Sequence, residues 1–429
     1  MALPPDRSVA DALCAFIDDS PSPYHAVASA AALLQEAGFS EVALDQPLPS
    51  GAGGRYVRRG GSIIAWRQPA GAVRAYRLVG AHTDSPNLRI KPQPDTSRAR
   101  FRQLGVEVYG GVLLNSWLDR DLGLSGRVSV RTPEGPEVRL LRVDEPLLRV
   151  PQLAIHLDRD IVTEGLKLNA QQHLAPVWDL DGDAGSEAAF TTFVGEQLGV
   201  GADDVLAWDV MAHDLTPSRR TGVGGVFVSA PRLDNLCSSF AGLRGLLAAP
   251  DDAPSTPVVC LYDHEEVGST SGTGADSALL GSVLERIALA SGADRAAFHA
   301  ALAGSLCVSA DMAHATHPNY ADRHEPDHQV AMNAGPVVKV NANQRYASDA
   351  ESIGVLLQAC DAAGIPTQRF VTRTDLPCGS TIGPITAARL GIPTVDVGVA
   401  QLAMHSTREL CGADDPDWYE RTMAAVLAG

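Results

Sequence analysis

The sequence predicts an α/β protein with a mixed, mostly parallel sheet flanked by helices and a β-rich module inserted into it. Near both ends of the chain, short apolar runs alternate with segments of helical apolar spacing. Between about residues 92 and 218, short β-like runs separated by Gly and Pro turns replace this alternation. The 429 residues also exceed the usual size of one domain. We therefore expect a discontinuous domain of residues 1–91 and 219–429 and an inserted domain of residues 92–218.

The composition indicates an acidic protein with a large core. The chain has 34 Lys and Arg against 51 Asp and Glu, a net charge of −17, and 45% hydrophobic residues. This charge disfavours nucleic acid and anionic membranes as partners. The seven cysteines form no CxxC pair, which is typical of free thiols in a reducing compartment. The N-terminus does not resemble a secretory signal, and the run Ala26–Leu34 is too short to span a bilayer. We expect a cytoplasmic protein with no nucleic-acid or membrane partner.

The elements of the first half follow from spacing and breakers. Pro21 and Pro23 separate two amphipathic segments, and Gly38 ends the second. The predicted elements, in order, are helices Val9–Asp18 and Ala26–Ala37, strands Ser62–Trp66 and Tyr76–Ala81, and then, in the inserted module, strands Gly105–Leu114, Gly126–Thr132 and Glu137–Val143 and a polar stretch Trp178–Ser186.

The second half returns to alternating strands and helices. The strands are short apolar runs, and the helices have apolar residues three or four positions apart. The predicted elements are strand Gly222–Ser229, helix Leu236–Leu247, strand Pro257–Tyr262, helix Leu279–Ala290, strand Leu306–Ala310, helix Ile353–Ala363, strand Gln368–Thr372, helix Gly379–Leu390 and strand Pro393–Val399.

Polar side chains follow five of the predicted strands. The carboxyl ends of strands in an open α/β sheet are where sites collect, so we expect these side chains to lie together. A mixed set of His and carboxylates suits zinc, manganese or cobalt. Six such groups exceed one tetrahedral shell and fit a pair of metal ions. The candidate residues are His82, Asp234, Glu265, Glu266, Asp311 and His405.

Two features of this set suggest a division of roles. Asp84 lies two residues after His82, on the same side of an extended segment, so its carboxylate could accept the second ring N–H of the imidazole. Of the adjacent Glu265 and Glu266, one would hold a metal and the other would move a proton, and spacing does not say which. Taken singly, each His or Asp is also compatible with a hydrogen-bonded structural role, and the Glu pair with a solvated loop.

Eight motifs occur along nearly the whole chain. They are Ser20–His25 (SPSPYH), Gly80–Pro86 (GAHTDSP), Pro231–Leu236 (PRLDNL), Asp263–Ser269 (DHEEVGS), Asp311–Tyr320 (DMAHATHPNY), Lys339–Tyr346 (KVNANQRY), Pro377–Pro384 (PCGSTIGP) and Met404–Ser406 (MHS). In sequence and order they resemble the M18 family of metallo-aminopeptidases, the aspartyl aminopeptidase type. The inserted module matches less specifically, mainly through Gln152–Asp158 (QLAIHLD).

The resemblance implies a di-zinc exopeptidase fold with two Zn²⁺ per subunit, Mn²⁺ or Co²⁺ being possible replacements. It implies that Asp234 bridges the metals and that Glu265 is the general base. The implied metal ligands are His82, Asp234, Glu266, Asp311 and His405. It further implies that residues 92–218 form a dimerisation domain, that dimers assemble into dodecamers, and that His156 reaches the active site of a partner subunit.

The implied substrates are peptides with a free N-terminus, often with Asp or Glu as the first residue. Lys339, a single cation in the apolar stretch Gly335–Val340, could pair with such an acidic side chain or with another group of the protein. Further residues of the substrate pocket would be Tyr346, Gly379, Ser380 and Thr381. A preference for neutral N-terminal residues, a carboxypeptidase or deacylase activity, and a non-catalytic assembly or cargo scaffold that retains metals are the alternatives.

Overall fold

The computed structural model describes residues 5–180 and 190–429. The chain divides into two compact units. Unit 1 contains Met1–Asp84, Ser218–Met404 and Glu409–Gly429, and unit 2 contains Ser85–Pro217 and His405–Arg408. Within the described ranges, no helix is long and apolar enough to cross a membrane.

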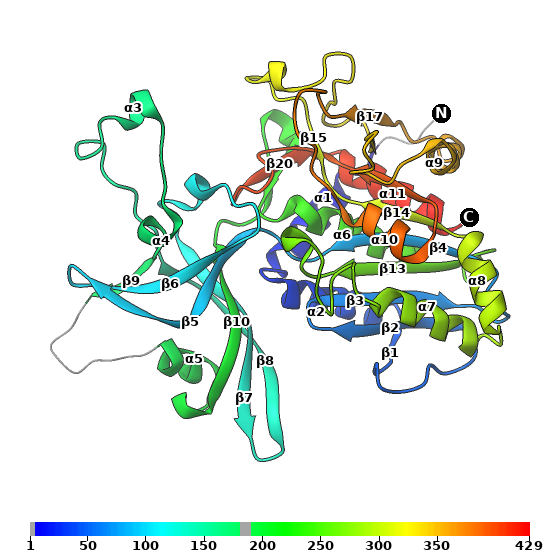
Figure 1. Ribbon diagram of the computed structural model, residues 1–429, viewed down its shortest axis with the longest axis horizontal. Coiled ribbons are helices and arrows are strands. Elements are labelled where there is room, and N and C mark those ends of the chain that lie inside the picture. Colours follow the sequence, from blue (N-terminus) through cyan, green and yellow to red (C-terminus); the bar gives the residue numbers. More distant parts are fainter. Residues whose placement is uncertain (1–4, 181–189) are drawn as a thin grey trace. The chain divides into compact units, whose positions relative to one another are not determined.

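A nine-stranded sheet forms the centre of unit 1 (Figure 1). In spatial order its strands are β1 (Ser40–Glu41), β2 (Gly53–Arg59), β3 (Ser62–Gln68), β13 (Thr256–Tyr262), β4 (Tyr76–His82), β14 (Leu306–Ala310), β18 (Thr394–Gly398), β16 (Val337–Val340) and β17 (Gln368–Val371). The central four, β13, β4, β14 and β18, run parallel, whereas β3 and β16 join them antiparallel. The predicted mixed, mostly parallel sheet is confirmed.

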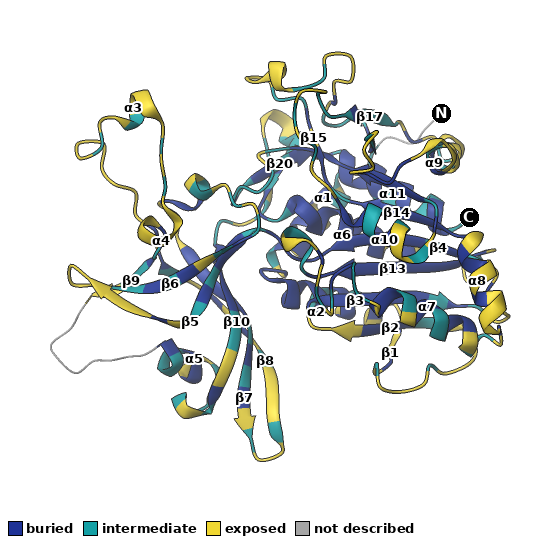
Figure 2. Ribbon diagram, viewed as in Figure 1, coloured by how far each residue is buried: buried dark blue, intermediate teal, exposed yellow. Residues whose placement is uncertain are grey.

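Helices cover both faces of this sheet, so its four central strands are buried except at Arg77 of β4, which is partly exposed (Figure 2). One apolar cluster packs the sheet against α1 (Ser8–Asp18), α2 (Pro23–Glu36), α6 (Leu233–Ala248), α9 (Ala350–Ala362) and α11 (Asp415–Leu427). Another packs it against α7 (Leu279–Ala290), α8 (Arg295–Ala303) and α10 (Ile382–Leu390). Helix α8, which is rich in Ala and only nine residues long, was not predicted from the sequence.

Unit 1 also contains a small five-stranded sheet. Its order is β11 (Arg219–Thr221), β12 (Phe227–Ala230), β20 (Glu409–Gly412), β19 (Ala400–Leu402) and β15 (Ala313–His314). The predicted strand Gly222–Ser229 is wrong in its first half. Three glycines with φ between 66° and 78° fold residues 222–225 into a turn that contains the 3₁₀ segment η3 (Val223–Gly225), and the strand begins at Phe227.

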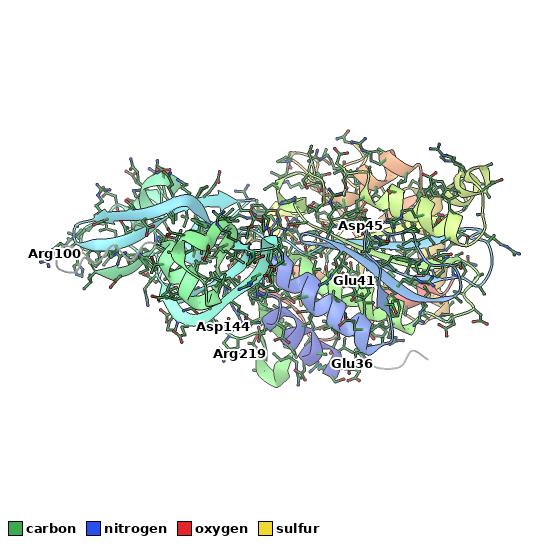
Figure 3. The ribbon with its side chains drawn as sticks, turned by 90° about the horizontal axis from the view of Figure 1, so that it is seen from below. Glu36, Glu41, Asp45, Arg100, Asp144 and Arg219 are labelled. Carbon is green, nitrogen blue, oxygen red and sulfur yellow. The ribbon has the colours of Figure 1, made fainter. Side chains whose placement is uncertain are left out.

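Unit 2 is a six-stranded antiparallel sheet with short helices. Its strand order is β8 (Gly135–Leu148), β7 (Leu122–Thr132), β10 (Val205–Asp214), β5 (Asn87–Arg98), β6 (Phe101–Tyr109) and β9 (Val177–Leu180). Its helical segments are η1 (Leu114–Trp117), α3 (Ile161–Glu164), α4 (Ala170–His173), α5 (Phe190–Leu198) and η2 (Ala202–Asp204). Arg100, which has a φ of 66°, lies at the tip of the β5–β6 hairpin (Figure 3). Of the predicted polar stretch Trp178–Ser186, residues 181–186 lie outside the described residues.

A buried carboxylate fixes the turn that leads into β16. Asp415, at the start of α11, accepts hydrogen bonds from the backbone N–H groups of Asn333 (2.7 Å) and Gly335 (3.0 Å). Its side chain is fully buried, and this burial raises its pKa from 3.8 to about 7. The turn that it holds is followed by the strand that carries Lys339.

Asp415→Asn should change the pH dependence of stability. Between pH 3.8 and about 7 the folded chain retains a proton that the unfolded chain has lost, so the free energy of unfolding falls as pH rises through this window. Asparagine does not titrate, so the variant should gain roughly 2–3 kcal/mol relative to wild type between pH 5 and pH 8. Urea unfolding of both proteins at the two pH values measures this gain. A difference that stays constant with pH would show that Asp415 is ionised throughout.

Candidate metal centre

The centre of the site is the imidazole of His82, the last residue of β4. This strand lies between β13 and β14, so the side chain emerges where three parallel strands end. It is 1% exposed. Its Nδ1 lies 3.0 Å from the backbone oxygen of Asp84 and 3.5 Å from the Asp84 carboxylate. A carbonyl oxygen can only accept, so Nδ1 carries a proton and Nε2 is directed at the rest of the site.

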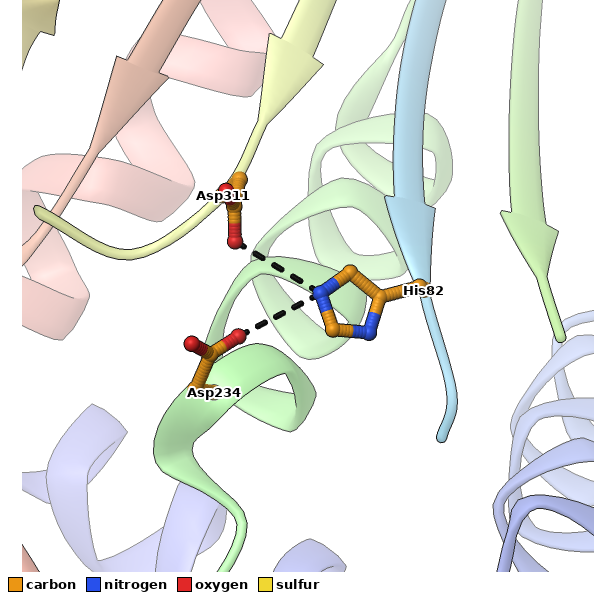
Figure 4. A group of neighbouring side chains, drawn as sticks. All are labelled: His82, Asp234 and Asp311. Atoms are coloured by element: carbon orange, nitrogen blue, oxygen red, sulfur yellow. Dashed lines mark ion pairs between the residues drawn. The ribbon is translucent and has the colours of Figure 1, made fainter. Parts of the chain in front are cut away.

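Two aspartates approach Nε2 of His82 from different elements (Figure 4). Asp234 Oδ1 lies 3.3 Å away and Asp311 Oδ1 lies 3.5 Å away. Asp311 directly follows β14, as predicted from the strand-end pattern. Asp234 lies in the first turn of α6, after the left-handed residue Arg232 (φ 55°), and its backbone N–H donates to Glu409 Oε2 at 2.9 Å. Glu409, on β20, is a supporting residue that the sequence analysis missed.

The two glutamates lie on η4 (Glu265–Val267), just after β13. The buried Asp84 carboxylate accepts the N–H of Glu265 on Oδ1 and the N–H of Glu266 on Oδ2, both at 3.1 Å. Asp84 thus fixes the backbone of both glutamates, in addition to its contact with His82. Its carboxylate was expected to bind the ring N–H of His82, but the shorter contact there is made by its backbone oxygen.

The charges in this site call for a cation. Glu265 Oε2 lies 4.0 Å from His82 Nε2, so three carboxylates approach one ring nitrogen. Burial alone lowers the pKa of His82, but its hydrogen bonds to Asp234, Asp311 and Asp84 raise that pKa well above its ordinary value. Burial and the neighbouring carboxylates raise the pKa of Glu265 to about 8. Each shift adds positive charge or removes negative charge, and a bound divalent ion would do the same.

Within unit 1, two groups of ligand atoms lie close enough to share a metal ion. One comprises His82, Asp234 and Asp311, and the other comprises His82, Glu265 and Glu266, with the ligand atoms of each group within 4.8 Å of one another. Imidazole and carboxylate donors of this kind fit zinc. All five residues belong to unit 1 and were predicted from the sequence.

The other predicted metal ligand, His405, belongs to unit 2 with residues 405–408. In that unit its Nδ1 lies 2.9 Å from the backbone oxygen of Gly111, a contact that directs Nε2 away from Gly111. His156 is exposed in a turn of the same unit. The roles of His405 and His156 stay predictions.

Lys339 is buried beside the aspartate end of the cluster. It is 1% exposed, and its Nζ donates to Asp311 Oδ2 and to the backbone oxygen of Met312, both at 3.1 Å. The ammonium also lies 5.0 Å from the ring centre of Tyr346. The pairing of Lys339 with a group of the protein, left open by the sequence, therefore occurs, and its contact with a substrate stays a prediction.

The remaining predicted residues lie on two segments that reach a cavity of about 170 Å³ in unit 1. Tyr346 and Gly379 line it, and Ser380 and Thr381 continue the same segment. The sequence predicted a helix from Gly379, but α10 begins only at Ile382 because Thr381 caps it, with its hydroxyl accepting from Gly383 N–H. The cavity is further lined by residues that include His314, Arg323, Arg373 and Phe370.

Comparison with known proteins agrees with this geometry. The family model described as aminopeptidase I zinc metalloprotease (M18) matches residues 16–424. A Streptomyces coelicolor protein described as a probable M18 family aminopeptidase 2 is 52% identical over 427 residues, which cover 98% of both chains.

Two solved structures extend the comparison. A chain of the Ape4 and Nbr1 complex is 34% identical, with a TM-score of 0.95 over 98% of this chain and 86% of that one. A chain of the S. cerevisiae mApe1 dodecamer is 26% identical, with a TM-score of 0.84 over 98% and 96% of the two chains. The resemblance noted in the sequence is confirmed, and the chain belongs to the M18 family of zinc metallo-aminopeptidases.

Proposed function

We propose that this M18 family member removes the N-terminal residue, preferentially Asp or Glu, from peptides, with two metal ions and Glu265 as the general base. The observation that carries the proposal is the position of Glu265. Its carboxylate lies at the edge of the ligand cluster, 4.0 Å from His82 Nε2, and its backbone is fixed by Asp84. A base needs this combination of proximity to the reacting centre and a fixed orientation.

In this proposal five side chains hold the metals. Asp234 would hold two Zn²⁺ ions together with His82, Glu266, Asp311 and His405. The spacing of the ligand atoms of unit 1 and their mixed His and carboxylate chemistry support this assignment. Bound zinc would supply the charge that lowers the pKa of a water molecule and polarises the scissile carbonyl.

Glu265 then moves the proton. Burial and the surrounding carboxylates raise its pKa to about 8, so its surroundings favour the protonated form that a general base must reach during the reaction. It would take the proton from the attacking water and deliver it to the leaving amine. Glu266, held by the other oxygen of Asp84, stays on the metal. The two adjacent glutamates thereby have different roles although one carboxylate orients both.

Lys339 supports recognition of an acidic N-terminal side chain. An ammonium group has three N–H donors, and within the described ranges two of them meet Asp311 and the Met312 oxygen. The third could meet a substrate carboxylate beside Tyr346. The cavity that Tyr346 lines is also lined by Arg323, Arg373 and Glu325, so two cations and one carboxylate face an occupant.

Unit 2 supports the proposal that the chain works as a dimer. The residues around His156 include four exposed apolar side chains, Leu153, Ile155, Leu157 and Val162, of which Val162 is 80% exposed. Neighbouring apolar residues this exposed commonly mark a protein interface. A related chain forms the S. cerevisiae mApe1 dodecamer. We propose that dimers of this chain bring His156 to the partner's active site and that the dimers assemble into a dodecamer.

Glu265→Gln should retain the metals and lose turnover. Glutamine keeps the shape of the side chain but cannot carry a proton, so kcat on an Asp-anilide should fall by about 10²–10⁴-fold. Activity is measured with and without a chelator, and zinc content by elemental analysis. Glu266→Gln is the matched control and should lose zinc. Near-normal turnover by zinc-loaded Glu265→Gln would contradict the role of base. Cleavage of N-acetylated peptides as fast as free ones would favour the deacylase or carboxypeptidase alternative.

Lys339→Met should change specificity as well as rate. Methionine fills the space but leaves Asp311 without its ammonium partner, so activity should fall on all substrates. The contact with an acidic substrate would be lost in addition, so the ratio of kcat/KM for Asp-anilide over Leu-anilide should fall by about 10–100-fold. Equal losses on the two substrates would limit Lys339 to the support of Asp311.

His156→Ala and Glu265→Gln should complement each other if His156 acts across an interface. Each variant alone should be nearly inactive. A mixed dimer has one site with intact Glu265 that receives an intact His156 from the other subunit, so random mixing should restore up to about a quarter of the wild-type activity. The subunits are separated and reassembled before the assay. Failure to regain activity in mixed dimers verified by mass would place His156 in its own subunit's site or outside the reaction.

A further inference from the structure

Asp396 is a buried carboxylate for which the proposed reaction has no use. It lies in the middle of β18, between β14 and β16, and is 0% exposed. Its Oδ2 accepts the backbone N–H of Ala347 at 2.6 Å, and its Oδ1 accepts the hydroxyl of Thr381. Its own backbone N–H donates to the hydroxyl of Ser348 at 2.8 Å. A carboxylate is costly to bury, so this arrangement needs compensation.

The cost of burying the Asp396 carboxylate is offset by the positive charge of the neighbouring Lys339. Lys339 is the antiparallel neighbour of Asp396 on β16, and its positive charge favours the ionised carboxylate. Burial acts in the opposite direction and raises the pKa of Asp396. The fit around the carboxylate is tight, because a Cβ on Gly383 would lie 2.5 Å from Oδ2. The start of α10 can therefore approach Asp396 only with glycine at this position.

Two of the hydrogen bonds of the Asp396 carboxylate reach the two segments that carry the predicted substrate-binding residues, and a third comes from Ser309 on β14. Ala347 follows Tyr346, and Thr381 ends the segment Gly379–Thr381. Nearer the surface the same segments are joined again. Arg345 Nε donates to the Gly379 oxygen at 3.3 Å, and the Ser380 hydroxyl donates to the Arg345 oxygen at 3.2 Å. These outer contacts are exposed, so the buried carboxylate is the stronger constraint on the segments.

We propose that Asp396 is a positioning residue that sets substrate affinity, because it fixes two adjoining segments that contribute Tyr346 and Gly379 to the lining of the substrate cavity. The proposal rests on the function proposed above, and it assigns Asp396 no contact with substrate or metal. Its effect should therefore fall on KM and leave the chemical step largely intact.

Asp396→Asn tests the proposal on the zinc-loaded, full-length chain. Asparagine keeps the shape but has one acceptor oxygen, so it can accept from only one of Ala347 and Thr381. KM for Asp-anilide should rise about tenfold, whereas kcat should change by less than about threefold and zinc content should stay the same. Hydrogen exchange should become faster in peptides that cover residues 341–349 and 377–381 and stay unchanged around His82.

Three further variants separate positioning from general loss of stability. Asp415→Asn alters another fully buried carboxylate that holds backbone N–H groups, outside the residues that line the cavity, and should leave KM unchanged. Thr381→Val removes one donor to Asp396 and should raise KM in the same way, whereas Thr381→Ser keeps the hydroxyl and should restore it. An unchanged KM and unchanged exchange in Asp396→Asn would overturn the proposal, as would a loss confined to kcat or faster exchange throughout the chain.

The failure of the proposed function would be distinguishable from the failure of this inference. If zinc-loaded wild type releases no N-terminal residue, the proposed function fails. The hydrogen-exchange comparison still decides whether Asp396 fixes the two segments. If wild type is active and Asp396→Asn shows neither the KM shift nor the local exchange, only the positioning role fails.

Discussion

The repulsion among carboxylates around His82 is the constraint on which the rest of the site depends. Asp234, Asp311 and Glu265 all approach one imidazole nitrogen within 3.3–4.0 Å. Such a cluster persists only if the backbone holds each group there, and only with positive charge among them. The parallel strands β13, β4 and β14 supply the first condition for Glu265, His82 and Asp311 because they end side by side, and the first turn of α6, held by Glu409, supplies it for Asp234. A proton on His82 or bound metal supplies the second.

The candidate metal ligands and Glu265 were predictable from the sequence because each follows a predicted strand. A polar residue directly after an apolar strand is visible in one dimension, and parallel topology brings such residues to one edge. The hydrogen bonds that hold these residues in place leave no comparable pattern in the sequence. Glu409 holds the backbone of Asp234 from 175 residues away, and the two N–H groups that Asp84 binds lie 181 and 182 residues from it. Only the folded chain shows these pairings, because the partners share neither a motif nor a spacing.

The elements that were misplaced have local physical causes. The helix was predicted to begin at Gly379, but the hydroxyl of Thr381 accepts the free N–H of Gly383 in the first turn of α10, so the helix begins after Thr381. Glycines at positive φ likewise delay β12 until Phe227. In both places the chain turns at residues that hydrophobic periodicity does not register. The first of these errors lies in the predicted substrate pocket, where an irregular backbone rather than a helix surrounds the cavity.

Two neighbouring buried charges, Lys339 and Asp396, contact both the candidate metal cluster and the predicted substrate-binding segments. Lys339 contacts the ligand Asp311 and neighbours Asp396 across the sheet. Asp396 in turn holds the segments of Tyr346 and Thr381. An apolar layer of the same volume would be easier to bury, but it could not orient a carboxylate at one end and two loops at the other. Lys339 and Asp396 therefore divide two tasks between them: Lys339 orients the carboxylate of Asp311, and Asp396 fixes the segments of Tyr346 and Thr381.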